Sequence, residues 1–325
     1  MDDILPLSNT TFQSVEIDLP MICEAHGSFY NPTNPSIIKT DDGYAVICRT
    51  VNFMHTEKKM YLLIDPQASE TSKTRNFLIE YTKDFHRLSQ HEIANDNLTI
   101  IKNLPEKLEK FEIEDARIFS TNPIRFISSI YSPDPKNNNF SQVGISFVLN
   151  NSIDYHIEDI VVLKGPNLEL CEKNWLPFFQ DGLLHVIYYY DPFVIYAVDE
   201  KNGKTTKCVE YRPSLDFSSF RGSAGPVPFD DGYLVVVHEM FLNKKKFYFH
   251  RFLYLDREFN ITKISLPFIY RHKGIEFCCG MTIDHSGSNL LMGVGIEDSE
   301  ALIVTVDLDT VRSTLQPVDN YQSKE

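Results

Sequence analysis

Short apolar segments recur along the whole chain, and turn residues interrupt them roughly every ten residues. The segments are rich in aromatic and β-branched side chains, as at positions 44–47, 183–187, 233–237 and 290–292. An amphipathic helix needs apolar residues at three- and four-residue spacing over about 12 residues, and the best such window, 104–111, is weak. The pattern therefore predicts an all-β chain.

A longer repeat is superimposed on this pattern. A small or Pro-containing approach leads to a Gly-centred or polar turn, then to an apolar strand with a polar residue at its end. The turns lie near positions 43, 123, 182, 232 and 287, so the units are roughly 50 to 80 residues apart, about the length of a four-stranded propeller blade with its loops. Five units predict a five-bladed β-propeller, with a pair of β-sandwiches as the structural alternative.

The repeat also suggests where the propeller begins and ends. We expect it to occupy residues 31–312, with residues 1–30 as a strap that closes the last blade and residues 313–325 as a flexible polar tail. The first interval between turns is the longest. It leaves room for an extra loop or strand pair around residues 65–97.

The charge balance excludes two classes of partner. The chain has 31 Lys and Arg against 45 Asp and Glu, a formal net charge of −14, and its basic residues are scattered. Nucleic acids and anionic membranes are bound by clustered basic residues, so neither is an expected partner. No segment reads as a signal peptide or a membrane span, which makes the cytoplasm the expected compartment and reduced thiols the expected state of the six cysteines.

One charged cluster stands out, because the acidic residues Glu112, Glu114 and Asp115 precede Arg117 at the start of an apolar strand. It has two interpretations. It is either a salt bridge at a sheet edge or the general acid of an enzyme, held on an innermost strand that lines the propeller channel. Arg117 favours the ionised form of its neighbour Asp115. An acid role therefore requires Arg117 to be engaged by Glu114, Glu112 or an anionic substrate.

Polar residues stand at the ends of the other recurrent strands: Arg49, Asn52, Asp191, His238 and Asp298. In an open sheet they are simply solvated, whereas in a propeller they converge on one mouth of the channel and predict a ligand site. Lys173 and Arg221 add positive charge, which suggests an anionic group beside a polyhydroxylated substrate. Aromatic residues that can stack on sugar faces are Trp175, Tyr188, Tyr189 and Tyr190.

Taken in order, these segments resemble a known family. The segments are Asn34-Pro35-Ser36 through Arg49, Glu114-Asp115-Ala116-Arg117, Lys173-Asn174-Trp175, Gly222-Ser223-Ala224-Gly225-Pro226 through His238, His250 to Asp256, and Glu276 through Gly295 and Asp298. They are similar to the motifs of glycoside hydrolase family 130, the five-bladed propeller β-mannoside phosphorylases and mannosidases, with related mannosyltransferases. The resemblance covers residues 31 to 310, with Ala116 where the family has Pro.

The resemblance implies an inverting reaction at a β-mannosidic bond. Asp115 matches the family's proton donor, whose proton passes through a substrate hydroxyl while inorganic phosphate attacks the anomeric carbon from the opposite face. Phosphate is then a co-substrate, and no metal or other cofactor is expected. The candidate phosphate-binding residues are Arg117, Lys173 and His238, with Arg49 beside them. The candidate substrate-binding residues are Asn34, Arg49, Asn52, Glu114, Asn174, Asp191, Arg221, Glu276 and Asp298.

Three alternatives accompany this hypothesis. The first is transfer from a nucleotide-activated sugar, which needs no free phosphate. The second is hydrolysis, which needs a second carboxylate such as Glu276 or Asp298 roughly 6.5 to 9.5 Å from Asp115 to hold the attacking water. The third is a non-catalytic propeller that binds carbohydrate or protein. In each catalytic case the expected partner is a small oligosaccharide or a sugar phosphate, and the sequence leaves the oligomeric state open.

Overall fold

The structure is a computed structural model. It describes residues 5–6, 14–17, 29–55, 61–64, 72–95, 100–108, 111–132, 140–150, 154–166, 171–243 and 245–320. Most of these residues are in β-strands, and the one α-helix in this part of the chain is α1 (Leu308–Thr314). The prediction of an all-β chain is confirmed.

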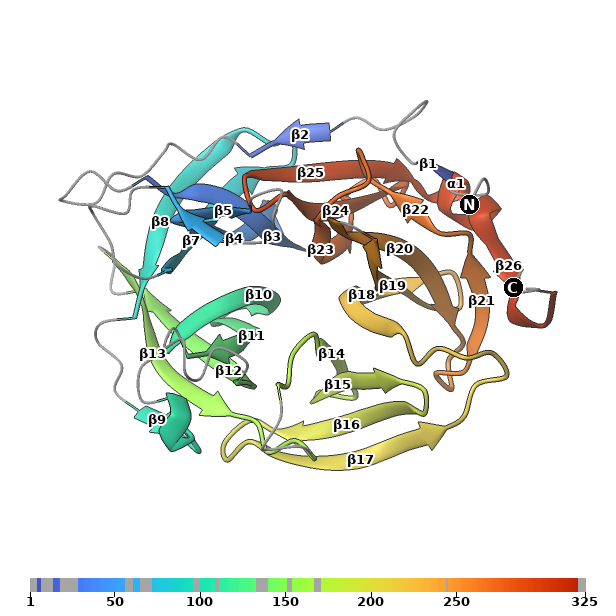
Figure 1. The fold of residues 1–325 in the computed structure, drawn as a ribbon, viewed down its shortest axis with the longest axis horizontal. Helices are drawn as coiled ribbons and strands as arrows, with labels where there is room; N and C mark the ends of the chain where they lie inside the picture. Colours follow the sequence, from blue (N-terminus) through green and yellow to red (C-terminus); the bar gives the residue numbers. More distant parts are fainter. Residues whose placement is uncertain are drawn as a thin grey trace.

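The strands follow one another as antiparallel meanders arranged in a ring (Figure 1). The first comprises β3 (Asn31–Lys39), β4 (Gly43–Val51), β7 (Thr74–Thr82) and β8 (Arg87–Ala94). The second comprises β10 (Glu112–Thr121), β11 (Ile124–Tyr131), β12 (Ser141–Asn150) and β13 (Tyr155–Val162). The third comprises β14 (Leu176–Gln180), β15 (Leu183–Tyr190), β16 (Phe193–Asp199) and β17 (Lys204–Tyr211). The fourth comprises β18 (Phe220–Phe229), β19 (Gly232–Asn243), β20 (Lys245–Leu255) and β21 (Ile261–Ser265). The last comprises β23 (Glu276–Ile283), β24 (Asn289–Ile296) and β25 (Glu300–Asp307).

Shorter elements lie between or beside these meanders. They are β1 (Leu5–Pro6), β2 (Ser14–Glu16), β5 (Phe53–His55), β6 (Tyr61–Leu63), β9 (Ile100–Lys102), β22 (Phe268–Ile269), β26 (Leu315–Pro317) and the 3₁₀ turns η1 (Glu106–Leu108) and η2 (Val318–Asn320). The hairpin β5–β6 is an extra strand pair in the first interval of the repeat. It precedes the region expected for such a pair, because β7 and β8 belong to the meander itself.

The first strand of each meander closes the ring on the inside. β3 contacts β10, and contacts between first strands continue through β14, β18 and β23 back to β3. On the outside, β2 adds an antiparallel edge strand to β25, with Val15 opposite Ile303, so a segment of the predicted N-terminal strap completes the last meander. The observed arrangement is a ring of sheets (Figure 1), not the pair of sandwiches considered as the alternative.

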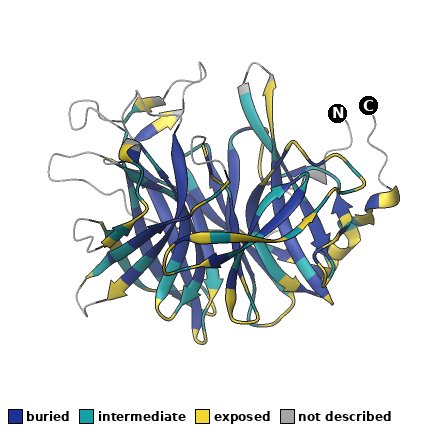
Figure 2. Ribbon diagram, turned by 90° about the horizontal axis from the view of Figure 1, so that it is seen from below, coloured by how far each residue is buried: buried dark blue, intermediate teal, exposed yellow. Residues whose placement is uncertain are grey.

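The hydrophobic core lies between neighbouring meanders. Ile37 and Val46 of the first pack in one cluster with Leu291 and Ile303 of the last. Clusters of the same kind join the other pairs of neighbours. Both faces of a strand such as β4 are therefore covered, and β4 is buried along its whole length, including its polar residues Arg49 and Thr50. Figure 2 shows the ring from its edge, with buried residues along most strands and exposed residues mainly in turns and on outer strands.

The chain remains folded beyond Arg312, where the sequence predicted a flexible tail. α1 begins after Asp307, whose side chain accepts hydrogen bonds from the backbone N–H groups of Asp309 and Thr310. β26 then pairs with β21, and Val318 is buried in the core. Ordinary pairing and burial thus fix this stretch as far as Asn320, while residues 321–325 lie outside the described part of the chain.

None of the helices in the described residues has the length and apolar character needed to cross a bilayer.

Candidate active site

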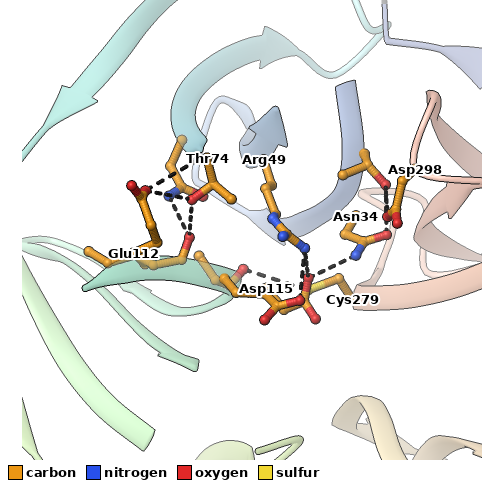
Figure 3. Close-up of polar contacts among 12 residues, drawn as sticks. Asn34, Arg49, Thr74, Glu112, Asp115, Cys279 and Asp298 are labelled. Carbon is orange, nitrogen blue, oxygen red and sulfur yellow. Dashed lines mark hydrogen bonds and ion pairs between the residues drawn. The ribbon is translucent and has the colours of Figure 1, made fainter. Parts of the chain in front are cut away.

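Two innermost strands are interrupted by bulges at the same end of the ring. In β3 the register with β4 shifts between Thr33 and Ser36, and Asn34 between them has φ 46°. In β10 the register with β11 shifts between Glu114 and Arg117, and Asp115 has φ 56°. Asn and Asp tolerate this left-handed backbone better than other non-glycine residues, and bulges redirect side chains near functional sites. Each bulge turns one polar side chain toward the other (Figure 3).

These two side chains meet a buried arginine. Asn34 Nδ2 donates to Asp115 Oδ1 at 2.8 Å, and Arg49 Nη1 donates to the same oxygen at 3.2 Å (Figure 3). Arg49 Nη1 also lies 3.1 Å from Glu114 Oε1. Burial lowers the pKa of Arg49, but the charges of Glu114 and Asp115 outweigh burial and raise it above its ordinary value. Arg49 therefore remains a cation shared by two carboxylates.

A second contact extends this network to the last meander. Thr33 Oγ1 lies 2.9 Å from Asn34 Oδ1 and 3.4 Å from Asp298 Oδ1. Asp298 has φ 50° and follows β24. Residues from the first, second and last meanders are thus joined through hydrogen bonds at one end of the ring (Figure 3).

The network forms part of the wall of a pocket of about 760 Å³, a volume typical of small-molecule sites. Nine of the predicted site residues line it: Asn34, Arg49, Glu114, Asp115, Lys173, Asn174, Arg221, His238 and Asp298. Other lining residues include Phe53, Glu172, Tyr188, Tyr189, Lys246 and Tyr248. The ring therefore brings into one cavity polar residues that are spread over most of the sequence.

Basic groups face this pocket from the third and fourth meanders. Partial burial lowers the pKa of Lys173, whereas nearby Glu114 and Asp115 raise it, and the net shift is upward, so Lys173 is charged at neutral pH. His238 is buried, and burial together with the neighbouring His250, Arg117 and Lys173 holds the pKa of His238 well below the usual range. Ser223 Oγ lies 2.9 Å from His238 Nδ1. His238 is therefore a neutral hydrogen-bonding group.

Arg117 is buried and is not among the residues that line this pocket. Its Nε donates to the carbonyl of Ser223 at 3.0 Å, its Nη1 to the carbonyl of Asp115 at 3.1 Å and its Nη2 to Asn174 Oδ1 at 3.3 Å. Arg117 thus holds the backbone at the Asp115 bulge and leaves the Asp115 carboxyl to other partners. The acceptors of Arg117 are therefore not the Glu114 or Glu112 side chains named in the sequence analysis, and Arg49 is the arginine that contacts the Asp115 carboxyl.

Three other predicted residues lie outside the pocket lining and have structural contacts instead. Asn52 Oδ1 accepts from the backbone N–H of Lys73 at 2.7 Å. Asp191 Oδ2 accepts from the backbone N–H of Phe217 at 3.4 Å. Glu276 is fully buried and accepts from the backbone N–H groups of Tyr270, Arg271 and His272. Burial raises the pKa of Glu276, whereas these hydrogen bonds oppose the rise.

Only two of the four aromatic residues predicted to contact a sugar line the pocket. Tyr188 and Tyr189 line the pocket, while Trp175 and Tyr190 are buried away from it. Trp175 Nε1 lies 3.3 Å from Glu172 Oε2, and Tyr188 donates to Glu172 Oε1 at 3.1 Å. Sequence reasoning missed Glu172, Lys246 and Tyr248. In the sequence, only its position beside Lys173 could have indicated Glu172. Its burial and its contact with Trp175 depend on the fold.

Comparison with known proteins finds solved structures that share the fold of this chain. No protein-family profile and no curated protein sequence matches the chain. A β-1,2-mannobiose phosphorylase from Listeria innocua, solved with β-1,2-mannobiose, aligns over 96% of this chain and 95% of its own with a TM-score of 0.55 and 12% identity. A mannose phosphorylase from Leishmania mexicana, solved with a phosphate ion, aligns over 88% and 87% of the two chains with a TM-score of 0.50 and 14% identity.

A third structure extends this group to a transferase. A GDP-Man-dependent mannosyltransferase from Leishmania mexicana aligns over 90% of this chain and 88% of its own, with a TM-score of 0.51 and 10% identity. The fold is shared. The chain has the propeller-like architecture on which these carbohydrate-active enzymes are built, as the sequence resemblance implied.

Proposed function

We propose that this protein is a carbohydrate-active enzyme that carries out inverting phosphorolysis of a β-mannoside-type glycosidic bond, with Asp115 as the general acid, on a five-bladed β-propeller. One observation carries the proposal. The Asp115 carboxyl is held by Asn34 and Arg49 in the wall of a pocket of about 760 Å³ that also contains the charged Lys173. Such a pocket supplies an oriented acid and positive charge for an anionic nucleophile.

The proposed reaction breaks one C–O bond and forms another. Asp115 gives its proton to a substrate hydroxyl, which passes its own proton to the oxygen of the leaving sugar. Inorganic phosphate attacks the anomeric carbon from the opposite face, so the products are a sugar 1-phosphate and the free leaving sugar. Asn34 and Arg49 fix the direction of the Asp115 carboxyl. Asp298, Asn174, Tyr188 and Tyr189 line the same pocket. In this proposal Asp298 and Asn174 accept hydrogen bonds from sugar hydroxyls, and Tyr188 and Tyr189 contact sugar faces.

Lys173 and His238 are the proposed phosphate ligands. Both line the pocket, and Lys173 lies near enough to Asp115 for the Asp115 charge to raise the pKa of Lys173. His238 is neutral and can offer one ring N–H to a phosphate oxygen. Arg117 supports the site through its hydrogen bonds to Ser223, Asp115 and Asn174, which occupy its donors.

Release of inorganic phosphate from mannose 1-phosphate and a panel of acceptor sugars tests the proposal in the reverse direction. Asp115→Asn should lower turnover by a factor on the order of 10² to 10⁴, the usual contribution of a general acid. Asp181→Asn is the matched control, because Asp181 has nearly the same backbone angle, φ 52°, but is exposed in a turn away from the pocket. Its rate should equal that of the unmodified protein.

Two outcomes would contradict the proposal. An unchanged rate in folded Asp115→Asn removes the acid role. Cleavage of a β-mannoside by water, with no phosphate dependence, replaces phosphorolysis by hydrolysis. In that case Asp298 is the remaining candidate for the second carboxylate, because Glu276 is buried against the backbone of residues 270–272.

A further inference from the structure

The hairpin formed by β19 and β20 carries exposed apolar side chains beside the pocket. Met240 is 58% exposed and Leu242 is 66% exposed. Single exposed apolar residues are common on protein surfaces, whereas neighbouring ones mark places where another molecule binds. Phe241 lies between these two residues in the sequence and is also exposed. The face of the hairpin on which each side chain lies therefore decides what it can contact.

Met240 and Leu242 lie on the face of the hairpin that is turned toward the pocket. In the β19–β20 ladder, Met240 is opposite Tyr248 and Leu242 is opposite Lys246. Directly opposite residues in an antiparallel pair share a face, as do residues two apart on one strand. Met240, Tyr248 and Lys246 all line the pocket, so Leu242 continues the same wall toward solvent.

The other face of the hairpin is covered by its own aromatic residues. The rings of Phe241 and Phe247 stack with their centroids 5.7 Å apart, and each lies 5.3 Å from the ring of the buried Phe249. These three residues therefore have apolar contacts within the hairpin. Met240 and Leu242 lie instead beside the open pocket, where a ligand or a second protein molecule can cover them.

The wall that contains Met240 changes in character from its buried part to the mouth of the pocket. His238 is buried and can form hydrogen bonds, and its ring meets the half-buried ring of Tyr248 edge-on at 5.1 Å. The Nζ atom of Lys246 lies over the same ring, 5.1 Å from its centroid. Beyond Tyr248, Met240 and Leu242 offer apolar surface. A sugar hydroxyl buried against them would lose its hydrogen bonds to water, so they fit an apolar group.

Neighbouring elements add apolar residues to the same pocket. Phe277 of β23 lies edge-on to His238, with ring centroids 5.2 Å apart, and Ile275 precedes the same strand. Phe53, at the start of β5, also lines the cavity. The pocket thus combines an apolar wall with the polar network around Asp115. This combination fits a ligand that has a sugar at one end and an apolar group at the other.

We propose that the sugar released or accepted in the reaction carries an apolar substituent, an alkyl or aryl group linked through oxygen, which packs against Met240 and Leu242. This inference rests on the proposed function and specifies its substrate class. The rival occupant of the hairpin face is a second copy of this chain, which would bury the same two side chains without a substrate.

Binding measurements test the inference independently of catalysis. Calorimetry on the full chain compares hexyl β-mannoside with methyl β-mannoside, which contain the same sugar. We expect the hexyl glycoside to bind at least about tenfold more tightly, the effect of burying two methylene groups. The double variant Met240→Ser, Leu242→Ser should remove most of that advantage. Leu183→Ser is the control and should keep it, because Leu183 is 60% exposed but begins β15, the strand whose far end lines the pocket.

A parallel assay measures phosphate release from mannose 1-phosphate with the two glycosides as acceptors. Preference for the hexyl glycoside that is lost in the double variant supports both the function and the inference. A binding advantage without turnover supports the apolar site and counts against the proposed function. Turnover that is equal for the two glycosides supports the function and overturns the inference.

Two further results would overturn the inference. The first is failure of the hexyl glycoside to bind more tightly than the methyl glycoside, or an advantage that the double variant keeps. The second is self-association, measured by sedimentation velocity, that the double variant loses. The hairpin face would then be an interface between two copies of the chain.

Discussion

At the scale of single residues, the candidate site depends on an amide and a carboxyl that are 81 positions apart in the sequence. Asn34 and Asp115 both have positive φ, and their side chains meet at 2.8 Å because both strands bulge at the same end of the ring. The Glu-Asp-Ala-Arg motif predicted Asp115 as a candidate. The contact between Asp115 and Arg49 was not predicted, because Arg117 is the arginine nearest in sequence, and the fold directs Arg117 to the carbonyl groups of Ser223 and Asp115 instead.

The buried His250 should make the stability of the protein depend on pH. His250 is fully buried, neither ring nitrogen has a hydrogen-bond partner among the described residues, and burial lowers its pKa to about 3. In the unfolded chain a histidine titrates near pH 6.5, so below that pH the unfolded state binds a proton that the native state excludes. The free energy of unfolding should therefore fall by about 1.4 kcal/mol per pH unit from this residue as pH drops from 6.5 toward 3.

Denaturant unfolding at pH 7.5 and pH 5.5 measures this dependence. His250→Leu should reduce the loss of stability between the two pH values by about 1.4 kcal/mol. The exposed His86→Gln should leave the loss unchanged. Identical pH dependence in His250→Leu and the unmodified protein would show that the pKa of His250 is the same in the native and the unfolded states.

At the scale of elements, close packing of β24 against β3 holds Asn34 in place. A Cβ atom at Gly295 would overlap the side-chain oxygen of Asn34. The same Cβ atom would lie 2.5 Å from the backbone nitrogen of Asn34. Gly293 approaches the backbone of Pro35 in the same way. The bulge in β3 therefore depends on two glycines in a strand about 260 residues later in the chain, and glycine is used where backbones approach this closely.

Gly295→Ala tests this packing. The added methyl should displace Asn34, destabilise the protein by about 1 to 3 kcal/mol and lower the activity of the folded fraction. Gly182→Ala is the comparison, because its φ of +75° makes alanine unfavourable by about 1 kcal/mol while no atom lies within 4 Å of the new Cβ. Thermal unfolding and activity per folded molecule should separate the two variants. Full activity in Gly295→Ala would mean that the backbone of β3 accommodates the added methyl group without displacing Asn34.

At the scale of the whole molecule, the ring is closed by chain segments from its two ends. β2 pairs with β25, and Ile17, which follows it, is 2% exposed in the cluster between the last and first meanders. An open ring would leave an edge strand and two apolar faces in water. Closure therefore stabilises every meander, including the two that carry Asn34 and Asp115.

Ile17→Ala measures the contribution of closure. Removing this buried side chain should lower the free energy of unfolding by about 2 to 5 kcal/mol, as expected for an isoleucine in a packed core. Val15→Ala, at a half-buried position of the same segment, should cost less. Chemical denaturation compares the two. A smaller effect at Ile17 than at Val15 would show that the segment lies on the ring without closing it.

The sequence by itself determined the class of secondary structure, the repeated unit and the presence of Asp115 in a charged cluster, because these depend on local periodicity and turn chemistry. It did not indicate that residues 313–320 fold, since their order comes from pairing with β21 and from burial of Val318. The tertiary structure alone decided which polar residues share the pocket. Asn52, Asp191 and Glu276 have backbone partners, whereas Glu172 and Lys246 line the cavity, because side-chain neighbours depend on how the meanders close into a ring.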